Sequence, residues 1–304
     1  MTNRRFAAAV AAASLVLSGF VATTVHAAGP QVGVILPDSA SSPRWETDDR
    51  PLLAKAFTAA GVTYDIQNAL GDKTKFATIA QSMLTEGVKV LVLVNLDSPS
   101  AAAVEAAAKK QGVATIDYDR LTLGGSANYY VSFDNVAVGK LQGNGIVACL
   151  KAHKVAHPRV VYLNGAPTDN NATLFKQGYA SVVGPYLKKN HLNGKTCVSG
   201  QDSSAAGLAA ILTGDLSNTV YKPIAQEANA AAALAISLVK GTKAVTNGFT
   251  ADSTVAGRKV PSVLLVPTMI TKKNVEVTVT TKFRTAAEIC AIAGAAACSA
   301  NGVK

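Results

Sequence analysis

From residue 31 onward, short β-branched runs alternate with amphipathic stretches of helical length. The first five runs are QVGVIL, VTYDIQ, VKVLVLV, VATIDY and NYYVSF. The stretches between them predict helices over 44–60, 73–86 and 99–111, the last opening with Ser98 as cap and Pro99 in the first turn. Strands separated by helices in this way form parallel sheets covered on both faces. The pattern therefore predicts a doubly wound α/β lobe.

A second series of the same kind begins at Asp134. It predicts a helix to Leu150, the strand RVVYLNG, a helix over 168–190, the strand KTCVSGQ, an alanine-rich helix over 223–240 and the strand VPSVLLVP. The unit repeats at the scale of a whole domain, which excludes a solenoid. We expect two similar doubly wound parallel-sheet lobes with a ligand cleft between them.

The first 27 residues have the composition of a signal peptide. Arg4 and Arg5 precede an apolar stretch over 6–25, and the small-x-small sequence VHA ends at Ala27. A twin-arginine signal is the alternative to a general export signal. No cysteine follows the apolar stretch, so we expect a free periplasmic protein without a lipid anchor. No later stretch reaches the roughly 20 apolar residues of a membrane span.

The basic balance of the chain does not indicate a nucleic-acid partner. The formal charge is +10, which becomes +8 without the two arginines of the signal peptide. The lysines are scattered and an exported chain rarely meets nucleic acid, so we interpret the excess as a solvated basic surface.

Four cysteines in an oxidising compartment favour disulfides. Cys290 and Cys298 lie close together in EICAIAGAAAC and are predicted to form one bond. Cys149 and Cys197 remain as the second pair. The histidines show no ligand spacing, so we expect no metal, and we expect no cofactor.

Polar clusters stand where several of the predicted strands end. They are Asp119 with Arg120, the stretch 169–171, Asp202, and Lys222. Because ligands of open α/β sheets bind outside the carboxyl ends of the strands, these side chains should converge on one ligand. Carboxylates, carboxamides and a guanidinium offer donors and acceptors in planar geometry, which suits a ring of neutral hydroxyls. A sugar is the predicted ligand.

These motifs, in this order, resemble the type I periplasmic sugar-binding proteins of ABC transporters, closest to the D-xylose-binding group. The resemblance is carried by PRWETD, IDYDR, YYVSFDN, GAPTDNNATLF, VSGQD, TVYKPI, VPSVLL and PTMITKKN. It implies two lobes joined by three crossings that close on one monosaccharide and are then recognised by a membrane permease. It also implies a set of sugar-binding residues: Arg44, Trp45, Asp119, Arg120, Asp169, Asn171, Asp202 and Lys222.

Each of these residues has a structural alternative. Asp119 and Arg120 could form an ion pair, and Asp169 is a good helix N-cap whether or not Asn171 reaches the cleft. Trp45 could belong to the core instead of stacking on a sugar ring. Lys222, which precedes a first-turn proline, could be a solvated cation.

One part of the family pattern is absent near Tyr186 and Leu187. There, the helix that follows RVVYLNG runs directly toward KTCVSGQ, so two βα units of about 50 to 60 residues are missing. The gap removes an expected stacking aromatic and an Asn-Asp pair. We expect the truncated second lobe to be strained, swapped between chains or poorly ordered, whether the gap is real or a sequence error.

The predicted division is a signal peptide over 1–27, an N-terminal lobe over 28–133 plus 222–258, and an incomplete C-terminal lobe over 134–221 plus 259–304. The predicted function is a non-catalytic solute-binding protein that delivers a monosaccharide to an ABC permease. The alternative is a degenerate paralogue with weak sugar binding or a role at a chemoreceptor. An exported enzyme is the third class, but the sequence has no nucleophile elbow, metal triad or GxGxxG loop.

Overall fold

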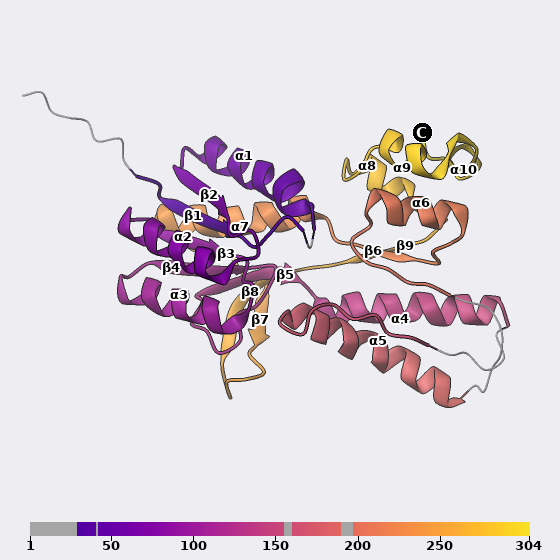
Figure 1. Cartoon of the computed structure of the whole chain (residues 1–304), viewed down its shortest axis with the longest axis horizontal. Helices are drawn as coiled ribbons and strands as arrows, with labels where there is room; N and C mark the ends of the chain where they lie inside the picture. Colours follow the sequence, from indigo (N-terminus) through magenta and orange to yellow (C-terminus); the bar gives the residue numbers. More distant parts are fainter. Residues whose placement is uncertain (1–28, 41, 155–159, 190–196) are drawn as a thin grey trace, which may run out of the picture.

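The computed structural model describes residues 29–40, 42–154, 160–189 and 197–304. The predicted signal peptide over 1–27 lies outside this range. The described chain divides into a larger and a smaller lobe (Figure 1). Among the described residues, no helix has both the length and the apolar character needed to cross a bilayer.

The larger lobe is built on a seven-stranded sheet in the order β2-β1-β3-β4-β5-β8-β7, parallel except for β7. Five of its strands are those expected from the first series of the sequence. The strands are β1 (Val32–Leu36), β2 (Tyr64–Asn68), β3 (Val90–Leu93), β4 (Ala114–Tyr118), β5 (Tyr129–Phe133), β7 (Gly248–Ala251) and β8 (Lys259–Leu265).

Helices cover both faces of this sheet, as a doubly wound lobe requires. One apolar core joins the sheet to α1 (Arg50–Ala60) and α7 (Ile224–Val239), and a second core joins it to α2 (Lys73–Thr85) and α3 (Ser98–Lys110). A short π-helix, η1 (Trp45–Asp49), precedes α1. The expected Ser98 cap of α3 is wrong, because Asp97 accepts the hydrogen bond from the Ser100 amide. Pro223 stands at the cap of α7, one position before the first turn.

The smaller lobe has two parts. One is the pair of long helices α4 (Asn135–Ala152) and α5 (Asn170–Lys189), which pack closely where Gly139 faces Gly178. The other is a small core around a two-stranded antiparallel sheet. It contains α6 (Ala205–Thr213), β6 (Thr219–Tyr221), β9 (Thr268–Ile270), α8 (Glu276–Thr280), α9 (Ala286–Ala293) and α10 (Ala295–Ala300).

Two of the strands predicted for the smaller lobe do not form. The described part of RVVYLNG has no strand assignment, and Val161 and Leu163 are 91% and 100% exposed. The described part of KTCVSGQ, from Cys197 onward, contributes only an isolated bridge between Ser199 and Asn218. A strand needs a neighbouring edge to pair with, and the two missing βα units would have supplied such neighbours. The expected parallel sheet of the second lobe is therefore absent from its described residues.

The chain crosses between the lobes after β5, after β6 and after β8. The first two crossings fall at Asp134 and at Lys222, where the sequence placed lobe boundaries. The third does not fall at residue 259. β8 pairs in parallel with β5 inside the large sheet, so the chain leaves the larger lobe only after Leu265.

Both predicted disulfides are present. Cys149 on α4 is joined to Cys197, and Cys290 on α9 is joined to Cys298 on α10. The first bond ties the end of α4 to the segment that enters the small core. The second holds the two last helices together.

Candidate functional site

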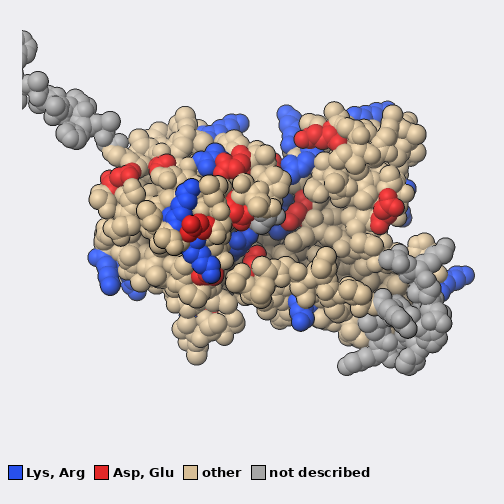
Figure 2. All heavy atoms as spheres, in the orientation of Figure 1, with Lys and Arg blue, Asp and Glu red and all other residues tan. Residues whose placement is uncertain are grey.

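The polar clusters identified in the sequence lie together at the junction of the two lobes. Figure 2 shows acidic and basic side chains gathered along this junction. The larger lobe provides η1 and the end of β4, and the smaller lobe provides the start of α5. Parallel strands end at one edge of the sheet, and the smaller lobe faces that edge.

Arg44 is the centre of the network on the larger lobe. It is 5% exposed, and it lies immediately before η1. Its Nε and Nη2 donate to the two carboxylate oxygens of Asp49 over 2.8 and 2.9 Å. Nη1 donates to Asp119 over 2.9 Å, and Nη2 also donates to Glu227 over 2.7 Å. These carboxylates outweigh burial, and they raise the pKa of Arg44 well above its usual value.

Asp119 follows β4 in a left-handed backbone conformation, with a φ of 64°. Asp tolerates this region better than most side chains do. Its carbonyl accepts hydrogen bonds from Tyr130, Ser132 and Asn171, which hold the unusual turn in place. Burial favours the neutral acid, but the charges of Arg44, Lys222 and Arg120 outweigh it and lower the pKa of Asp119. The group is therefore a carboxylate at neutral pH.

Asn171 connects the two lobes at this carboxylate. Its Nδ2 donates to Oδ1 of Asp119 over 3.1 Å, and its Oδ1 accepts from Nδ2 of Asn135 over 2.8 Å. Asp169 accepts the Asn171 backbone amide over 2.9 Å, so it caps α5 as the sequence alternative proposed. Within one turn, Asp169 therefore caps the helix and Asn171 contacts the other lobe.

Arg120 does not pair with its neighbour Asp119. Its Nε lies 3.4 Å from the Asp169 carboxylate, and its Nη1 donates to the Asn95 carbonyl over 3.1 Å. The first contact is long and poorly aligned, so the buried Nε of Arg120 makes no hydrogen bond to a described residue. Burial raises the pKa of Asp169. Arg120 and Asp169 thus form a loose pair from opposite lobes.

Trp45 is both a core residue and a neighbour of the cleft. It is 2% exposed and packs in the core beneath α1 and α7. The guanidinium carbons of Arg44 and Arg120 lie 4.3 and 5.7 Å from its ring centroid. Its buried Nε1 has no hydrogen-bond partner among the described residues. The indole supports the two arginines, and little of it is open to solvent.

Lys222 occupies the second crossing between the lobes. Its Nζ lies 2.9 Å from Asp202, which has a left-handed φ of 69° like Asp119. Phe133 and Phe175 flank the ammonium group at 6.0 and 5.5 Å. Burial lowers the pKa of Lys222, but Asp202 and Asp119 outweigh it and raise the pKa. The eight predicted site residues therefore lie around the junction as the Arg44–Asp119–Asn171 network, the Arg120–Asp169 pair, the Lys222–Asp202 pair, and Trp45 packed beside the two arginines.

The network also contains residues that the sequence did not single out. Asp49 is fully buried and accepts from Tyr118 as well as from Arg44. Glu227 on α7 is fully buried, and burial raises its pKa to about 8. A sequence signal for Glu227 existed, because it lies on the apolar face of an alanine-rich helix with Ile224 and Ala231. A charge on such a face needs a buried partner.

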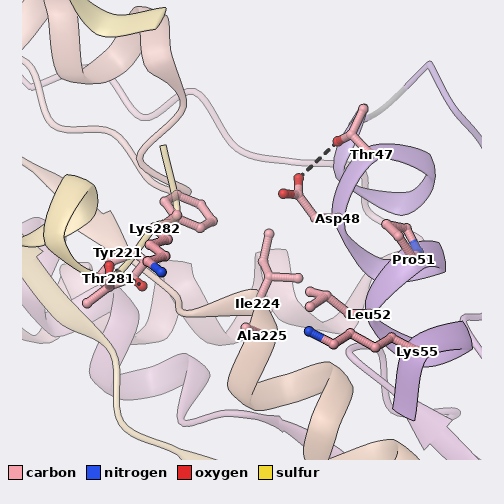
Figure 3. A pocket seen from close by; sticks show the side chains of 11 residues that line it. Thr47, Asp48, Pro51, Leu52, Lys55, Tyr221, Ile224, Ala225, Thr281 and Lys282 are labelled. Carbon is pink, nitrogen blue, oxygen red and sulfur yellow. Dashed lines mark hydrogen bonds between the residues drawn. The ribbon is translucent and has the colours of Figure 1, made fainter. Parts of the chain in front are cut away.

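A separate hollow of about 270 Å³ lies on the other side of the second crossing. Figure 3 shows Pro51 and Leu52 of α1 on one wall and Tyr221, Thr281 and Lys282 on the other. None of the eight predicted site residues lines it. An ion pair of 3.2 Å between Asp48 and Arg284 joins the lobes nearby. In the described part of the chain, no His, Cys, Asp and Glu cluster could hold a metal ion.

A larger and a smaller lobe that meet at a buried polar junction are the arrangement expected of a two-lobed binding protein. A family profile described as "Periplasmic binding protein domain" matches residues 32–187, just over half of the chain. The chain belongs to this family, as the resemblance of its motifs predicted.

Curated relatives agree with that assignment. The "D-xylose-binding periplasmic protein" of Escherichia coli (strain K12) is 28% identical over 322 aligned positions, covering 88% of this chain and 93% of the relative. The "Multiple sugar-binding periplasmic receptor ChvE" of Rhizobium radiobacter is 36% identical over 194 positions, covering 63% of this chain and 54% of the relative.

Solved structures share the fold. A carbohydrate transporter solute-binding protein from Chloroflexus aurantiacus in complex with D-glucose has a TM-score of 0.76 at 22% identity, covering 85% of this chain and 98% of that one. The Caulobacter myo-inositol binding protein has a TM-score of 0.64 at 20% identity, covering 84% and 97%.

The alignment with the E. coli relative also contains positions that this chain does not fill. It runs over 322 positions, yet 88% of 304 residues is about 268, so about 54 aligned positions hold no residue of this chain. This number agrees with the two βα units that the motifs predicted to be missing.

Proposed function

We propose that this chain is an exported, non-catalytic solute-binding protein that captures a monosaccharide and delivers it to an ABC transporter permease. The observation that carries the proposal is the continuous network Arg44–Asp119–Asn171, which joins the lobes at the edge of the large sheet. It presents carboxylate, carboxamide and guanidinium groups in one place, which suits vicinal hydroxyls.

A xylose-like aldopentose or a related sugar is the proposed ligand. The support comes from the D-xylose-binding relative and from the presence of the motif residues at the junction. We propose Arg44, Trp45, Asp119, Arg120, Asp169, Asn171, Asp202 and Lys222 as the sugar-binding set. Arg44 has five N–H groups, and four of them donate to the carboxyl groups of Asp49, Asp119 and Glu227. At most one N–H is therefore left for a sugar.

The proposed mature protein starts at Ala28 and is periplasmic, after removal of a signal peptide over 1–27. Its lobes are proposed to comprise 28–133 with 222–265, and 134–221 with 266–304. The third crossing is moved because β8 pairs with β5. Closure of these lobes on a sugar would present both of them to the permease.

A second candidate is a degenerate paralogue that binds sugar weakly or serves a chemoreceptor. The unformed strands of the smaller lobe favour it. The larger lobe would retain most of the polar network, but the wall supplied by the missing units would be lost. The two candidates differ in affinity: micromolar binding supports delivery to a permease, and millimolar binding supports the degenerate protein.

The test is a screen of the mature chain with D-xylose, L-arabinose, D-ribose, D-glucose and myo-inositol. Thermal shift identifies the ligand, and calorimetry gives its affinity. A ligand at 100 times its Kd should add about 2.7 kcal/mol to the stability. Trp45 is the only tryptophan, so its fluorescence gives an independent signal next to the arginines.

Two variants locate the site. Arg120→Ala should reduce the affinity at least tenfold, whereas Lys109→Ala, an exposed cation on α3 far from the junction, should leave it unchanged. A thermal shift that Arg120→Ala does not alter would place the sugar elsewhere. The absence of a shift with any of the sugars would count against sugar binding.

A further inference from the structure

Glu227 is a buried acid that the proposed sugar set does not include. It is fully buried in the first turn of α7, five positions after Lys222 in the second crossing. Oε2 accepts a hydrogen bond from Nη2 of Arg44 over 2.7 Å. Oε1 has no hydrogen-bond partner among the described residues. Burying a carboxyl group with one oxygen unsatisfied destabilises the fold, so a compensating contact or a functional role is expected for Glu227.

The geometry of Arg44 supplies that reason. Asp49 takes one guanidinium edge, Asp119 lies at Nη1, and Glu227 lies at Nη2. The planar guanidinium is therefore fixed from three directions. Because Nη1 holds Oδ2 of Asp119, any rotation of Arg44 moves the carboxylate that Asn171 also contacts. Among the described residues, Arg44 is the one hydrogen-bond partner of the Glu227 side chain, so Glu227 is hydrogen-bonded to the site only through it.

Burial, more than the surrounding charges, decides which form Glu227 takes, and it favours the neutral acid. Arg44, Asp49, Asp119 and Lys222 act on it, and the hydroxyls of Tyr118 on β4 and Tyr130 on β5 face the same group. With Glu227 neutral, Arg44 faces two carboxylates, Asp49 and Asp119, and Lys222 pairs with Asp202. An ionised Glu227 adds a third anion to the cage, competes for Arg44 and repels Asp119.

We propose that Glu227 is a positioning residue of the cleft: its neutral carboxyl holds Arg44 so that Arg44 fixes Asp119, and its ionisation lowers the affinity for sugar. The affinity part rests on the proposed function. The positioning part does not, because Arg44 packs 4.3 Å from the Trp45 ring and can be followed by fluorescence without any sugar.

Glu227→Gln is the central variant. Its amide oxygen can still accept from Arg44, but the side chain cannot ionise. The matched control is Glu105→Gln on α3. Glu105 is also fully buried, accepts the Ser126 amide and has an Oε1 without a hydrogen-bond partner among the described residues. Its neighbours Ser126 and Asp117 do not belong to the eight site residues.

The experiment measures Kd for the sugar found in the screen, and Trp45 fluorescence of the sugar-free protein, from pH 6 to pH 9. In the wild type and in Glu105→Gln, Kd should rise about tenfold as the pH increases through 8. This change corresponds to weakening one charge-assisted hydrogen bond. The fluorescence of Trp45 should change at the same pH. Glu227→Gln should keep the affinity of pH 7 and remain flat in both signals. Glu227→Ala, which removes the acceptor, should bind at least tenfold more weakly at every pH.

Two failures can be told apart. If no sugar binds while the fluorescence transition still depends on Glu227, the proposed function fails, together with the affinity part of this inference. If sugar binds and Glu227→Gln has the same pH profile as the wild type in both signals, Glu227 is only a structural residue and the inference alone is overturned.

Discussion

Asn171 in the smaller lobe donates a hydrogen bond of 3.1 Å to the carboxylate of Asp119 in the larger lobe. The contact joins two elements that are 52 positions apart in the chain. Both groups belong to the proposed sugar set, so the cleft residues of the two lobes satisfy each other directly. A sugar that enters the cleft would have to replace this bond with hydroxyl contacts of similar strength.

A charge at position 171 should separate the lobes. Asn171→Asp places a second carboxylate against Asp119 in a buried site, where like charges repel strongly. We expect a lower Tm, a larger radius of gyration in small-angle scattering and at least tenfold weaker sugar binding. Asn170→Asp, one position earlier at the start of α5, is the control and should be neutral. Equal behaviour of the two variants would show that the Asp119 contact does not hold the lobes.

Glu227 should make the stability fall as pH rises. Burial raises its pKa from 4.5 to about 8, so the folded state binds a proton that the unfolded state releases. The resulting stabilisation is fully present below pH 4.5, decreases as pH rises, and is lost above about pH 8. One pKa unit corresponds to about 1.36 kcal/mol, so the free energy of unfolding should fall by an amount on the order of a few kcal/mol.

Urea unfolding between pH 5 and pH 9 measures this contribution as the difference between the wild type and Glu227→Gln. The stability of the wild type relative to Glu227→Gln should decrease over this interval. Parallel stability curves would mean that Glu227 does not remain protonated in the folded protein.

The ion pair between Asp48 and Arg284 should affect closure more than folding. Its side chains are 21% and 19% exposed, so its effect on stability should stay below about 1 kcal/mol. The pair joins the lobes, however, and opening would break it. Arg284→Ala should weaken sugar binding by about two- to fivefold at low salt and less at high salt. Lys282 is an exposed cation beside the same hollow, so Lys282→Ala is the matched variant. An identical loss of affinity in Lys282→Ala would show that the positive charge of this region matters, and not the ion pair with Asp48.

The two disulfides should differ in their contribution to stability. Cys149 and Cys197 are 48 positions apart, and Cys290 and Cys298 are 8 apart. Loop-closure entropy predicts a loss of about 4 kcal/mol on replacing the first pair with serine and about 2.5 kcal/mol for the second. Chemical unfolding of the two double variants measures the order. The opposite order would mean that the small core depends on the second bond for packing.

Hydrogen exchange should be fast where the expected strands do not form. Val160 to Asn164 and Val198 to Gly200 should exchange rapidly, while Val90 to Leu93 in the large sheet stay protected. Inserting the two βα units of the E. coli relative near Leu187 should protect both segments and increase sugar affinity. Strong protection of all three segments in the chain as it stands would contradict the reading of an incomplete sheet.

The sequence predicted the strands of the larger lobe correctly for a local reason. Each strand of that lobe has its own apolar run, and its neighbours in the sheet come from the same intact series, so β1 to β5 form where their patterns predict. Asp119 lies at the junction because it follows β4, and the parallel strands of the large sheet end at one edge. Lys222 follows β6 of the separate antiparallel pair, so the crossing between the lobes, and not that sheet edge, brings it to the junction. The pairing of Arg120 was not predictable, since Asp169 reaches it from the other lobe.

The sequence by itself determined the α/β class, the family, both disulfide pairs and the polar clusters that meet at the junction, because these depend on local patterns and short motifs. Only the tertiary structure decided which partners complete them. RVVYLNG has the composition of a strand, yet no strand forms over its described residues, because pairing needs an edge from elsewhere in the chain. β8 belongs to the larger lobe because the edge of β5 was available there for pairing. Glu227 meets Arg44, 183 positions away, only in the folded chain, since a buried polar group is satisfied by the groups that folding brings around it.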